Sequence, residues 1–459
     1  MKTTAIIGAG PTGLSAAYAL HKNGHAVTVF EKNPHIGGAV RTSIEDGYLT
    51  ELGPNTLMLN DLRIQNLIKE LGIENEIIEA DHSSAKRFVI KGGKPVALPS
   101  SPKNLLSSKA ISFTAKLRLL REPFLKKYSG EADESFADFV RRRLGKQMLD
   151  YAAGPFVSGI YAGDAEKLSF RHAFPRLHKI EQAHSSIIKG FIKQKKLAKQ
   201  GKGDSNNLAK RKIISFKNGM QTLPTAIANT LPRDSILTET NITKIEQIKG
   251  DQPQWQITWQ DKSGNEQNQI LENIIIASPA HTLDQLGLPN EIISQLTQTT
   301  GIYHPPVASV LLGYKKEQIT HPLDGFGMLA SLPEKSPVLG ALFTSTLFPN
   351  RAPDGHVTIN VMIGGALTPE LALKEENELI ENAHGELNKL LGISGSPTYQ
   401  KLTVWKKAIP QANLGYQAVL DELNQVETTF PGLHLAGNYR GGISLPDSIL
   451  NGLELGYSL

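Results

Sequence analysis

IIGAGPTG, residues 6–13, follows the apolar run at residues 4–7 and precedes residues 14–20, whose composition favours a helix. A short apolar run of this kind predicts a buried parallel strand. In a strand–turn–helix unit, Gly8 permits the tight turn, Gly10 lets the backbone approach a pyrophosphate, and Gly13 lets helix and strand pack closely. The helix N-terminus then offers free N–H groups to a diphosphate. The stretch therefore predicts a dinucleotide-binding unit in a doubly wound α/β fold.

A second strand, expected at residues 26–30, ends at Glu31. A carboxylate about 20 residues past the glycines is where such folds bind the ribose hydroxyls of the dinucleotide. The alternative is a solvated charge at the end of a strand. We expect Glu31 to bind ribose.

The composition is that of a globular protein. The chain has 459 residues, 20% charged and 40% hydrophobic, which is long enough for two or three domains. No apolar run approaches the roughly 18 residues of a membrane-spanning helix. The start does not resemble a signal peptide, so we expect a cytoplasmic protein. With 0 cysteines the chain has no disulfide, no cysteine-ligated metal and no thioether to a cofactor, and its 13 histidines show no metal-binding spacing.

Basic residues are concentrated in one segment. Residues 187–212, IIKGFIKQKKLAKQGKGDSNNLAKRK, contain nine Lys or Arg residues and one acid, Asp204, in a chain of net charge +5. A solvated face is one interpretation, and attraction to an anionic membrane surface is the favoured functional one. We expect no nucleic acid as partner. The Lys/Gly/Asn-rich stretch around 195–212 is expected to be mobile.

Two further stretches indicate which dinucleotide is held. EKNPHIGGAVR, residues 31–41, and YLTELGPNT, residues 48–56, resemble the flavin enzymes of the glutathione-reductase-like superfamily, in its amine-oxidase branch. The resemblance implies that the first stretch wraps the diphosphate, with charge-assisted contacts from Arg41, and that the second runs beside the flavin ring. The cofactor would be non-covalent FAD. The implied contacts are Gly8, Ala9, Gly10, Pro11, Thr12, Gly13, Glu31, Gly38, Ala39, Arg41, Gly53, Pro54, Asn55 and Thr56.

The end of the chain adds a second helix N-terminus. In LAGNYRGGISLPDSILNG, residues 435–452, a strand ends at a glycine and a helix follows near Asp447. Its N–H groups and positive dipole end suit the pyrimidine edge of a flavin, where negative charge builds on reduction. The expected FAD contacts here are Asn438, Ile443, Ser444 and Leu445, and the backbone of Ile242 is expected at the adenine end. The chain stops at Leu459, which leaves open how the closing helix packs on the first βαβ unit.

The middle of the chain narrows the family. The stretches SFADFVRRRLG (135–145), GPFVSGIYAGD (154–164), HPLDGFGML (321–329) and RAPDG (351–355) resemble the protoporphyrinogen oxidase family, as does 435–452. The resemblance covers essentially the whole chain in order. It implies an α/β (α+β) architecture: a Rossmann-like FAD-binding domain of the glutathione-reductase and amine-oxidase type, a mixed-sheet substrate domain and a helical domain that docks on a membrane. The expected division assigns 1–83, 213–284 and 426–459 to FAD, 84–212 to the basic, membrane-docking helical domain, and 285–425 to substrate.

The resemblance also implies an activity. A member of this family carries out the FAD-dependent, oxygen-linked, six-electron oxidation of protoporphyrinogen IX to protoporphyrin IX in haem biosynthesis. Each two-electron step moves a hydride from a bridge carbon to flavin N5, and hydrogen peroxide is the by-product. Aromatisation drives the reaction, so no catalytic side chain is named. Arg87 matches the family's propionate-binding arginine, and Leu339 and Met362 match residues that sandwich the pyrrole rings. The alternatives are a solvated arginine and plain core residues.

Several alternatives stay open. The substrate could instead be coproporphyrinogen III, oxidised to coproporphyrin III. Amine oxidation, carotenoid desaturation and a non-catalytic flavin-binding scaffold are more remote. Either dioxygen or a membrane quinone would reoxidise the flavin. Family resemblance is compatible with hand-off to a ferrochelatase, with a homodimer, and with peripheral attachment to the cytoplasmic face of the inner membrane.

The sequence also predicts individual elements. Helices are expected at 110–125, 135–144 with Ser135 as N-cap, and 225–231. Strands are expected at 236–245, 255–259, 272–277, 307–314 and 356–363.

Overall fold

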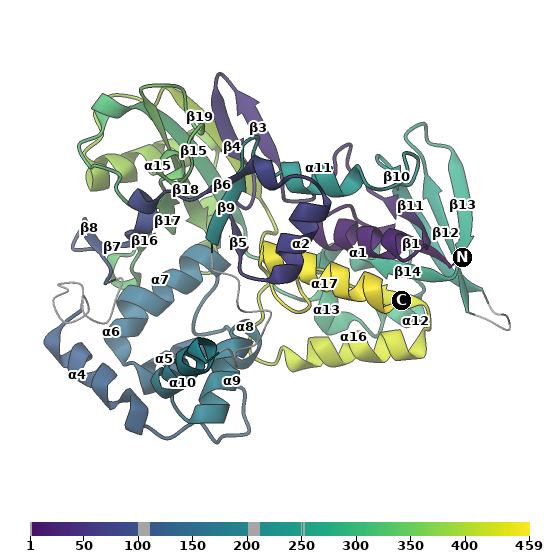
Figure 1. Ribbon diagram of the computed structural model, residues 1–459, viewed down its shortest axis with the longest axis horizontal. Coiled ribbons are helices and arrows are strands. Elements are labelled where there is room, and N and C mark those ends of the chain that lie inside the picture. Colours follow the sequence, from purple (N-terminus) through teal and green to yellow (C-terminus); the bar gives the residue numbers. More distant parts are fainter. Residues whose placement is uncertain (1, 100–110, 201–211, 249, 251–252) are drawn as a thin grey trace.

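The fold is built around two sheets and a group of helices (Figure 1). The computed structural model describes residues 2–99, 111–200, 212–248, 250 and 253–459. A five-stranded sheet lies toward one end of the molecule, a seven-stranded sheet toward the other, and the helices of residues 113–199 lie beneath the second sheet in this view.

The five-stranded sheet is parallel throughout, in the order β10-β2-β1-β14-β20. This 3-2-1-4-5 winding is that of a Rossmann-like sheet, which confirms the predicted fold class. Its apolar strands are buried on both faces because helices or a second sheet cover each side. The strands are β1 (Thr3–Ile7), β2 (Ala26–Phe30), β10 (Ile236–Leu237), β14 (Asn273–Ile276) and β20 (Leu433–Leu435).

The single strand expected at 236–245 is wrong, because the chain turns in its middle. Glu239 has a positive φ of 56°, and the N–H of Thr240 donates to the carbonyl of Glu31. After this turn β11 (Asn241–Ile248) leaves the parallel sheet and forms an antiparallel sheet with β12 (Gln254–Gln260) and β13 (Glu266–Leu271).

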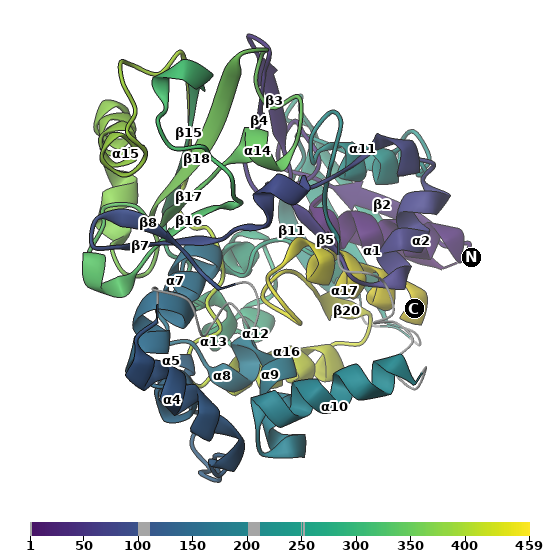
Figure 2. The same cartoon turned by 60° about the vertical axis from the view of Figure 1, so that its left-hand side comes forward.

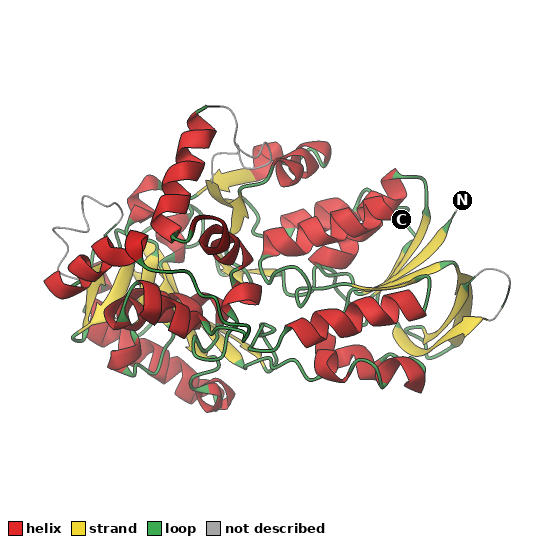
Figure 3. Cartoon of the chain, turned by 90° about the horizontal axis from the view of Figure 1, so that it is seen from below, coloured by secondary structure: helices red, strands yellow, loops and turns green. Residues whose placement is uncertain are grey.

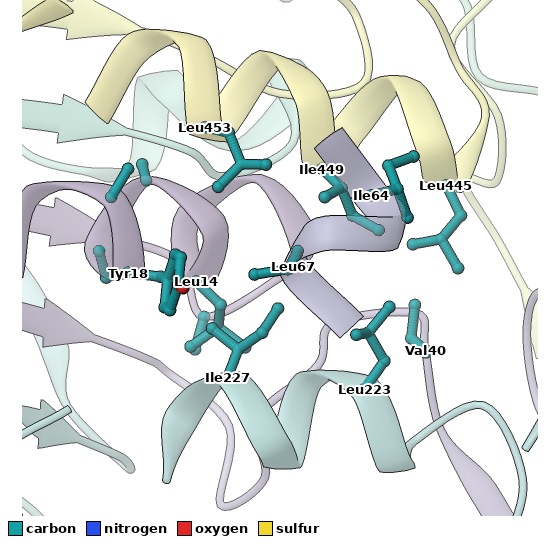
Figure 4. Packing of buried hydrophobic residues seen from close by; sticks show 14 of the residues in the cluster. Leu14, Tyr18, Val40, Ile64, Leu67, Leu223, Ile227, Leu445, Ile449 and Leu453 are labelled. Carbon is teal, nitrogen blue, oxygen red and sulfur yellow. The ribbon is translucent and has the colours of Figure 1, made fainter. Parts of the chain in front are cut away.

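Four helices pack on one face of the parallel sheet (Figure 4). They are α1 (Pro11–Lys22), α2 (Leu62–Glu70), α11 (Thr222–Ala228) and α17 (Leu445–Ser458). The closing helix α17 packs on the first βαβ unit, which answers the question of its packing that the sequence left open. Glycines allow the close approach: a Cβ built at Gly452 would stand 2.2 Å from the carbonyl oxygen of Thr12, and one at Gly456 would stand 2.6 Å from that of Ala16.

The other face of the parallel sheet is also covered, so helices lie on both sides of it (Figure 3). The covering elements are α12 (Asn290–Ile293), α13 (Thr297–Thr300), α16 (Gln417–Thr429) and the β11–β13 sheet. Phe30 meets Trp259 edge to face at 4.8 Å between ring centroids. Val419, Leu423 and Val426 of α16 belong to the same buried cluster, so the apolar surface of α16 joins the core of the parallel sheet.

The seven-stranded sheet is mixed, in the order β19-β15-β18-β17-β16-β7-β8. One face packs on α15 (Glu376–Leu391), visible beside it in Figure 2. The strands are β7 (Phe88–Lys91), β8 (Lys94–Ala97), β15 (Val307–Lys315), β16 (Gly327–Ala330), β17 (Gly340–Leu342), β18 (His356–Gly364) and β19 (Tyr399–Trp405). The helical character expected from residue 84 onward is therefore wrong for 88–97, whose alternating Phe88 and Ile90 join the sheet's core. The division of the chain into three domains stays a prediction.

The helical part consists of short helices, two of which the sequence predicts. Ser135 caps α5 (Phe136–Arg143) through the N–H of Asp138, which confirms that predicted start. The helix expected at 110–125 is shorter, because Ser112 caps α4 (Phe113–Arg121) and a 3₁₀ turn follows at Glu122–Phe124. Residue 110 lies outside the described residues. The other helices are α6 (Lys146–Met148), α7 (Gly154–Phe156), α8 (Phe170–Ala173), α9 (Pro175–His184) and α10 (Ile187–Lys199), with π-helical turns at Leu149–Ala153 and Val157–Tyr161.

The segment 195–212, expected to be mobile, lies partly within this structure. Residues 195–199 form the end of α10, and residues 201–211 lie outside the described part of the chain. Within the described residues, every helix is too short or too polar to cross a membrane.

Candidate functional site

The glycine turn after β1 forms a cradle at the start of α1. Gly8 has φ of 106°, and a Cβ built at Gly13 would stand 2.0 Å from the carbonyl oxygen of Gly8. A Cβ built at Gly10 would meet nothing within 4 Å. The first turn of α1 contains no acidic residue, and its first backbone bond runs from Leu14 to Gly10. The N–H groups of Thr12 and Gly13 are therefore placed to bind an anion in front of Gly10.

Glu31 lies beside this cradle. Its carboxylate accepts hydrogen bonds from the N–H of Ala9 at 2.9 Å and from the backbone and side-chain nitrogens of Asn33 at 2.8 and 2.7 Å. Its position at the end of β2 suits a ribose next to the diphosphate. Ile242 is buried in the core cluster that contains Phe30, two residues past the hydrogen bond from Thr240 to Glu31.

The loop after β2 returns to the cradle. The N–H of Gly37 donates to the carbonyl of Ala9, and a Cβ at Gly38 would stand 3.2 Å from the Cα of Gly10. Burial, followed by the charge of Arg41, lowers the pKa of His35 in this loop. Among the described residues no carboxylate pairs with Arg41, which leaves a cation beside the cradle for an anionic group.

The segment Gly53–Thr56 lies against this loop. A Cβ at Gly53 would stand 2.1 Å from the carbonyl oxygen of Ala39. The segment continues from the hairpin of β3 (Thr42–Glu45) and β4 (Tyr48–Glu51). The indole of Trp405, at the end of β19, donates to the carbonyl of Leu52 at 2.9 Å. The segment Gly53–Thr56 is thus fixed between the cradle and the seven-stranded sheet, with Asn55 buried and Pro54 and Thr56 half-buried.

The second helix N-terminus faces the same side of the molecule. Ser444 caps α17 with a capping box to Asp447, and Gly441 and Gly442 have positive φ in the loop before it. Gly452 of α17 lies beside Thr12, and Gly456 lies beside Ala16, so α17 and α1 run in the same direction. At 1.5 Å per residue the N-terminus of α17 lies about 10 Å beyond that of α1. Asn438, Ile443, Ser444 and Leu445 belong to this loop and helix start, and the two N-termini together could contact an extended dinucleotide at two points.

Leu339 and Met362 come together on the seven-stranded sheet. The N–H of Leu339 donates to the carbonyl of Met362 at 2.7 Å, and both belong to a cluster with Ala162 and Val307. Val361 and Ile363 pack toward α15, so Met362 lies on the opposite face. This is the face from which Trp405 reaches the segment Gly53–Thr56.

Arg87 lies farther along the same sheet. It precedes Phe88, which packs toward α15, so its side chain starts from the face that carries Met362. Three strand spacings separate β7 from β18, about 14 Å. The guanidinium donates to the carbonyls of Ser84, Ala85 and Lys86 and stacks on Phe326 at 4.0 Å. Within the described chain it has no carboxylate partner.

Two groups at this site were not singled out from the sequence. Glu51 and Arg351 are both buried, with 3.7 Å between Arg351 Nη2 and Glu51 Oε1. Glu51 lies in the motif ELGP and Arg351 in the motif RAPDG, but no local sequence pattern pairs residues 300 positions apart. The contact of Trp405 with Leu52 likewise has no signal in the sequence.

The chain is similar to flavoenzymes over its whole length. The model of the flavin containing amine oxidoreductase family matches residues 11–454. Protoporphyrinogen oxidase 2, chloroplastic/mitochondrial, of Arabidopsis thaliana is 33% identical over 475 residues, covering 99% of this chain and 92% of that protein. Coproporphyrinogen III oxidase of Bacillus subtilis (strain 168) is 26% identical over 467 residues, covering 98% and 96%. A solved structure of a protein from Exiguobacterium sp. 255-15 shares the fold with a TM-score of 0.81 and 20% identity, covering 100% of this chain and 98% of that one.

Proposed function

The chain belongs to the flavin containing amine oxidoreductases and, within them, to the porphyrinogen oxidases, and from this premise we propose that it oxidises protoporphyrinogen IX to protoporphyrin IX with FAD and dioxygen. The observation that carries the proposal is the sheet face on which Leu339 and Met362 form an apolar cluster. Arg87 stands on the same face, about 14 Å away by strand spacing. This is the scale of a tetrapyrrole with its acidic side arms.

The residues at the cradle fit FAD. The open space at Gly10 and the acid-free start of α1 suit the diphosphate, and Glu31 suits the ribose. The loop before α17 suits the flavin ring. When bound, the flavin supplies the acceptor for a hydride and returns the electrons to dioxygen. The protein's part is to hold and orient the two partners and to exclude water between them.

Arg87 would bind a propionate of the substrate. Its stack on Phe326 and its three bonds to backbone carbonyls hold the guanidinium in one place. A single placed cation suits a substrate with two carboxylate arms on one edge. Coproporphyrinogen III carries four such arms and is the main rival, since relatives of both activities match the full chain.

Porphyrin fluorescence in air tests the proposal. The flavin-loaded protein is given protoporphyrinogen IX and coproporphyrinogen III in parallel. We expect faster formation of protoporphyrin. Faster formation of coproporphyrin would assign the protein to the rival reaction, and no turnover of either substrate with flavin bound would contradict both.

The helical part adds a membrane-docking surface, defined here as the exposed side chains of α4, the turn Glu122–Phe124 and α10. Its apolar members are Phe113, Leu117, Leu120, Phe124, Phe191 and Ile192, of which Phe124 is 83% exposed. Its basic members include Lys189, whose ammonium lies 5.6 Å from the ring of Phe124, with Lys193, Lys195 and Lys196 beyond it. Exposed apolar side chains framed by lysines suit the headgroup region of an anionic bilayer.

A buried ionic network holds the docking surface together. Glu122 accepts from the hydroxyl of Ser186 and from the N–H of Ile187, so it caps the start of α10. Arg143, which is fully buried, donates to Glu181 and to the carbonyl of Ser185. The network fixes α10 against the turn that carries Phe124 and keeps that exposed ring beside Lys189, which supports peripheral attachment to a membrane.

A further inference from the structure

Glu51 and Arg351 lie where the cradle side of the molecule meets the seven-stranded sheet. Glu51 ends β4, directly before Leu52 and the segment Gly53–Thr56. Arg351 lies in the turn that leads into β18, the strand of Met362. The N–H of Leu49 also donates to the carbonyl of Arg351 at 3.3 Å, so the two chain segments are joined by backbone as well as by charge.

The two side chains tie several other elements to this junction. Glu51 accepts from the hydroxyl of Thr42 at 2.7 Å and from the N–H of Met220 at 3.0 Å. Arg351 donates to the hydroxyl of Ser215 at 2.6 Å and to the carbonyl of Phe216 at 3.3 Å. The hairpin β3–β4, the strand β9 (Lys212–Phe216) and the turn before β18 are therefore joined through one buried pair.

The pair is dry. The gap around it is lined by Leu49, Asn55, Leu311, Thr344, Leu347 and Phe348 and has no room for a water molecule. Burial raises the pKa of Glu51 to about 7, although Arg351 and the hydrogen bonds from Thr42 and Met220 act against the rise. Arg351 is the one charged group that faces Glu51 among the described residues, since the other neighbours are neutral.

We infer that Glu51 and Arg351 are a positioning pair, which sets the distance between the flavin-side segment Gly53–Thr56 and the sheet face that holds Met362. The inference rests on the proposed function, because it takes that segment to lie beside the flavin. Ionised Glu51 attracts Arg351 and draws the two segments together. When Glu51 is protonated the attraction is lost and the segment loosens, while the fold persists through the remaining hydrogen bonds.

The sign of the pH effect separates positioning from stability. The folded-state pKa of Glu51 lies above the usual value for glutamate, 4.5. The folded protein therefore takes up this proton first, and the contribution of Glu51 to stability increases as the pH falls from about 7 to 4.5. A rate that falls over the same window cannot come from unfolding through this group.

The test measures the rate of flavin reduction by porphyrinogen at saturating substrate, and the reduction potential of the bound flavin, from pH 5.5 to 8.5. In the wild type we expect the rate to rise about tenfold through pH 7 and the potential to follow a different pH dependence from that of Glu51→Gln, because a carboxylate that draws the segment toward the flavin interacts differently with the oxidised and the reduced ring. Glu51→Gln should stay at the low-pH rate, with only the change of slope that the flavin's own ionisation gives. Arg351→Lys keeps the positive charge that faces Glu51. This variant should therefore retain part of the wild-type pH dependence, which a merely structural role would not predict.

The matched control is Glu45→Gln. Glu45 lies on the same hairpin and also pairs across to the seven-stranded sheet, at 2.7 Å from Lys401, but that pair is exposed. The Glu45→Gln variant should keep the wild-type rate of flavin reduction and the wild-type reduction potential. A Glu51→Gln profile that follows the wild type, or a Glu45→Gln profile that follows Glu51→Gln, would overturn the inference. If neither porphyrinogen reduces the wild-type flavin, the proposed function fails, and the difference in potential between the wild type and Glu51→Gln across pH 7 still decides the positioning pair.

Discussion

The carbonyl oxygen of Gly8 occupies the space that a side chain at residue 13 would need, since a Cβ built on Gly13 stands only 2.0 Å from it. A Cβ built on Gly10, three residues earlier, would have no atom within 4 Å. The two glycines are therefore required for different reasons. Gly13 serves the packing of α1 on β1, and Gly10 keeps open the space in front of the helix.

This contrast predicts two different phenotypes. Gly13→Ala should lower the free energy of unfolding by about 1–3 kcal/mol, with or without FAD, because overpacking strains the fold itself. Gly10→Ala should leave the flavin-free protein as stable as the wild type but weaken FAD binding at least tenfold. Urea unfolding of the flavin-free protein and fluorescence titration with FAD separate the two effects. Equal loss of stability in both variants would contradict the assignment of Gly10 to the cofactor.

The contact between α17 and α1 predicts a second pair of outcomes. Gly452→Ala should destabilise the protein by about 1–3 kcal/mol, because its Cβ would stand 2.2 Å from the carbonyl oxygen of Thr12. Gly385 of α15 is also helical but has nothing within 4 Å, so Gly385→Ala should stabilise by about 0.5–1 kcal/mol through helix propensity. Thermal unfolding measures both. If Gly452→Ala left the stability of the protein unchanged, the two helices would be able to move apart without loss of stability.

Local chemistry explains which features were predictable. The glycine turn, the place of Glu31 at the end of a strand and the Ser135 cap depend on a few neighbouring residues, so the sequence indicates them directly. The split at Glu239 depends on a bond to Glu31 made only in the folded chain. The joining of 88–97 to β16 and the pairing of Glu51 with Arg351 bring together residues more than 200 positions apart. Alternation and motif spacing report faces and turns, but they do not report which distant segment covers them.

The place of Arg87 predicts a change in substrate binding without loss of the flavin. Arg87→Ala should raise KM for the porphyrinogen about tenfold to a hundredfold, because a hydrogen bond to a charged group contributes about 1.5–3 kcal/mol. Arg87→Lys should recover only part of this, since an ammonium cannot form the bidentate contact. Steady-state kinetics with the flavin content measured in each variant checks the prediction.

Lys86→Ala is the matched control for Arg87. Lys86 is the adjacent cation and is exposed as Arg87 is, but it differs in pairing with a carboxylate, that of Asp324. Its KM should equal that of the wild type. A rise in KM shared by both variants would indicate a general effect of charge and would remove Arg87 from the substrate site.

The membrane-docking surface predicts a binding that has two separable parts. Leu120→Ser with Phe124→Ser should abolish sedimentation with vesicles at every salt concentration, because the two side chains are 65% and 83% exposed and would supply the inserted apolar area. Lys193→Glu with Lys196→Glu should weaken binding only to vesicles that contain anionic lipid, and less so as salt is raised. Ile270→Ser on β13 removes a side chain that is 51% exposed, far along the chain from this surface, and should change nothing.

Equal binding of the Leu120/Phe124 variant and the wild type would show that these apolar side chains do not enter the bilayer. Loss of binding in the Ile270 variant would show that the assay measures general hydrophobicity. Only a loss confined to the Leu120/Phe124 and Lys193/Lys196 variants would assign docking to this face.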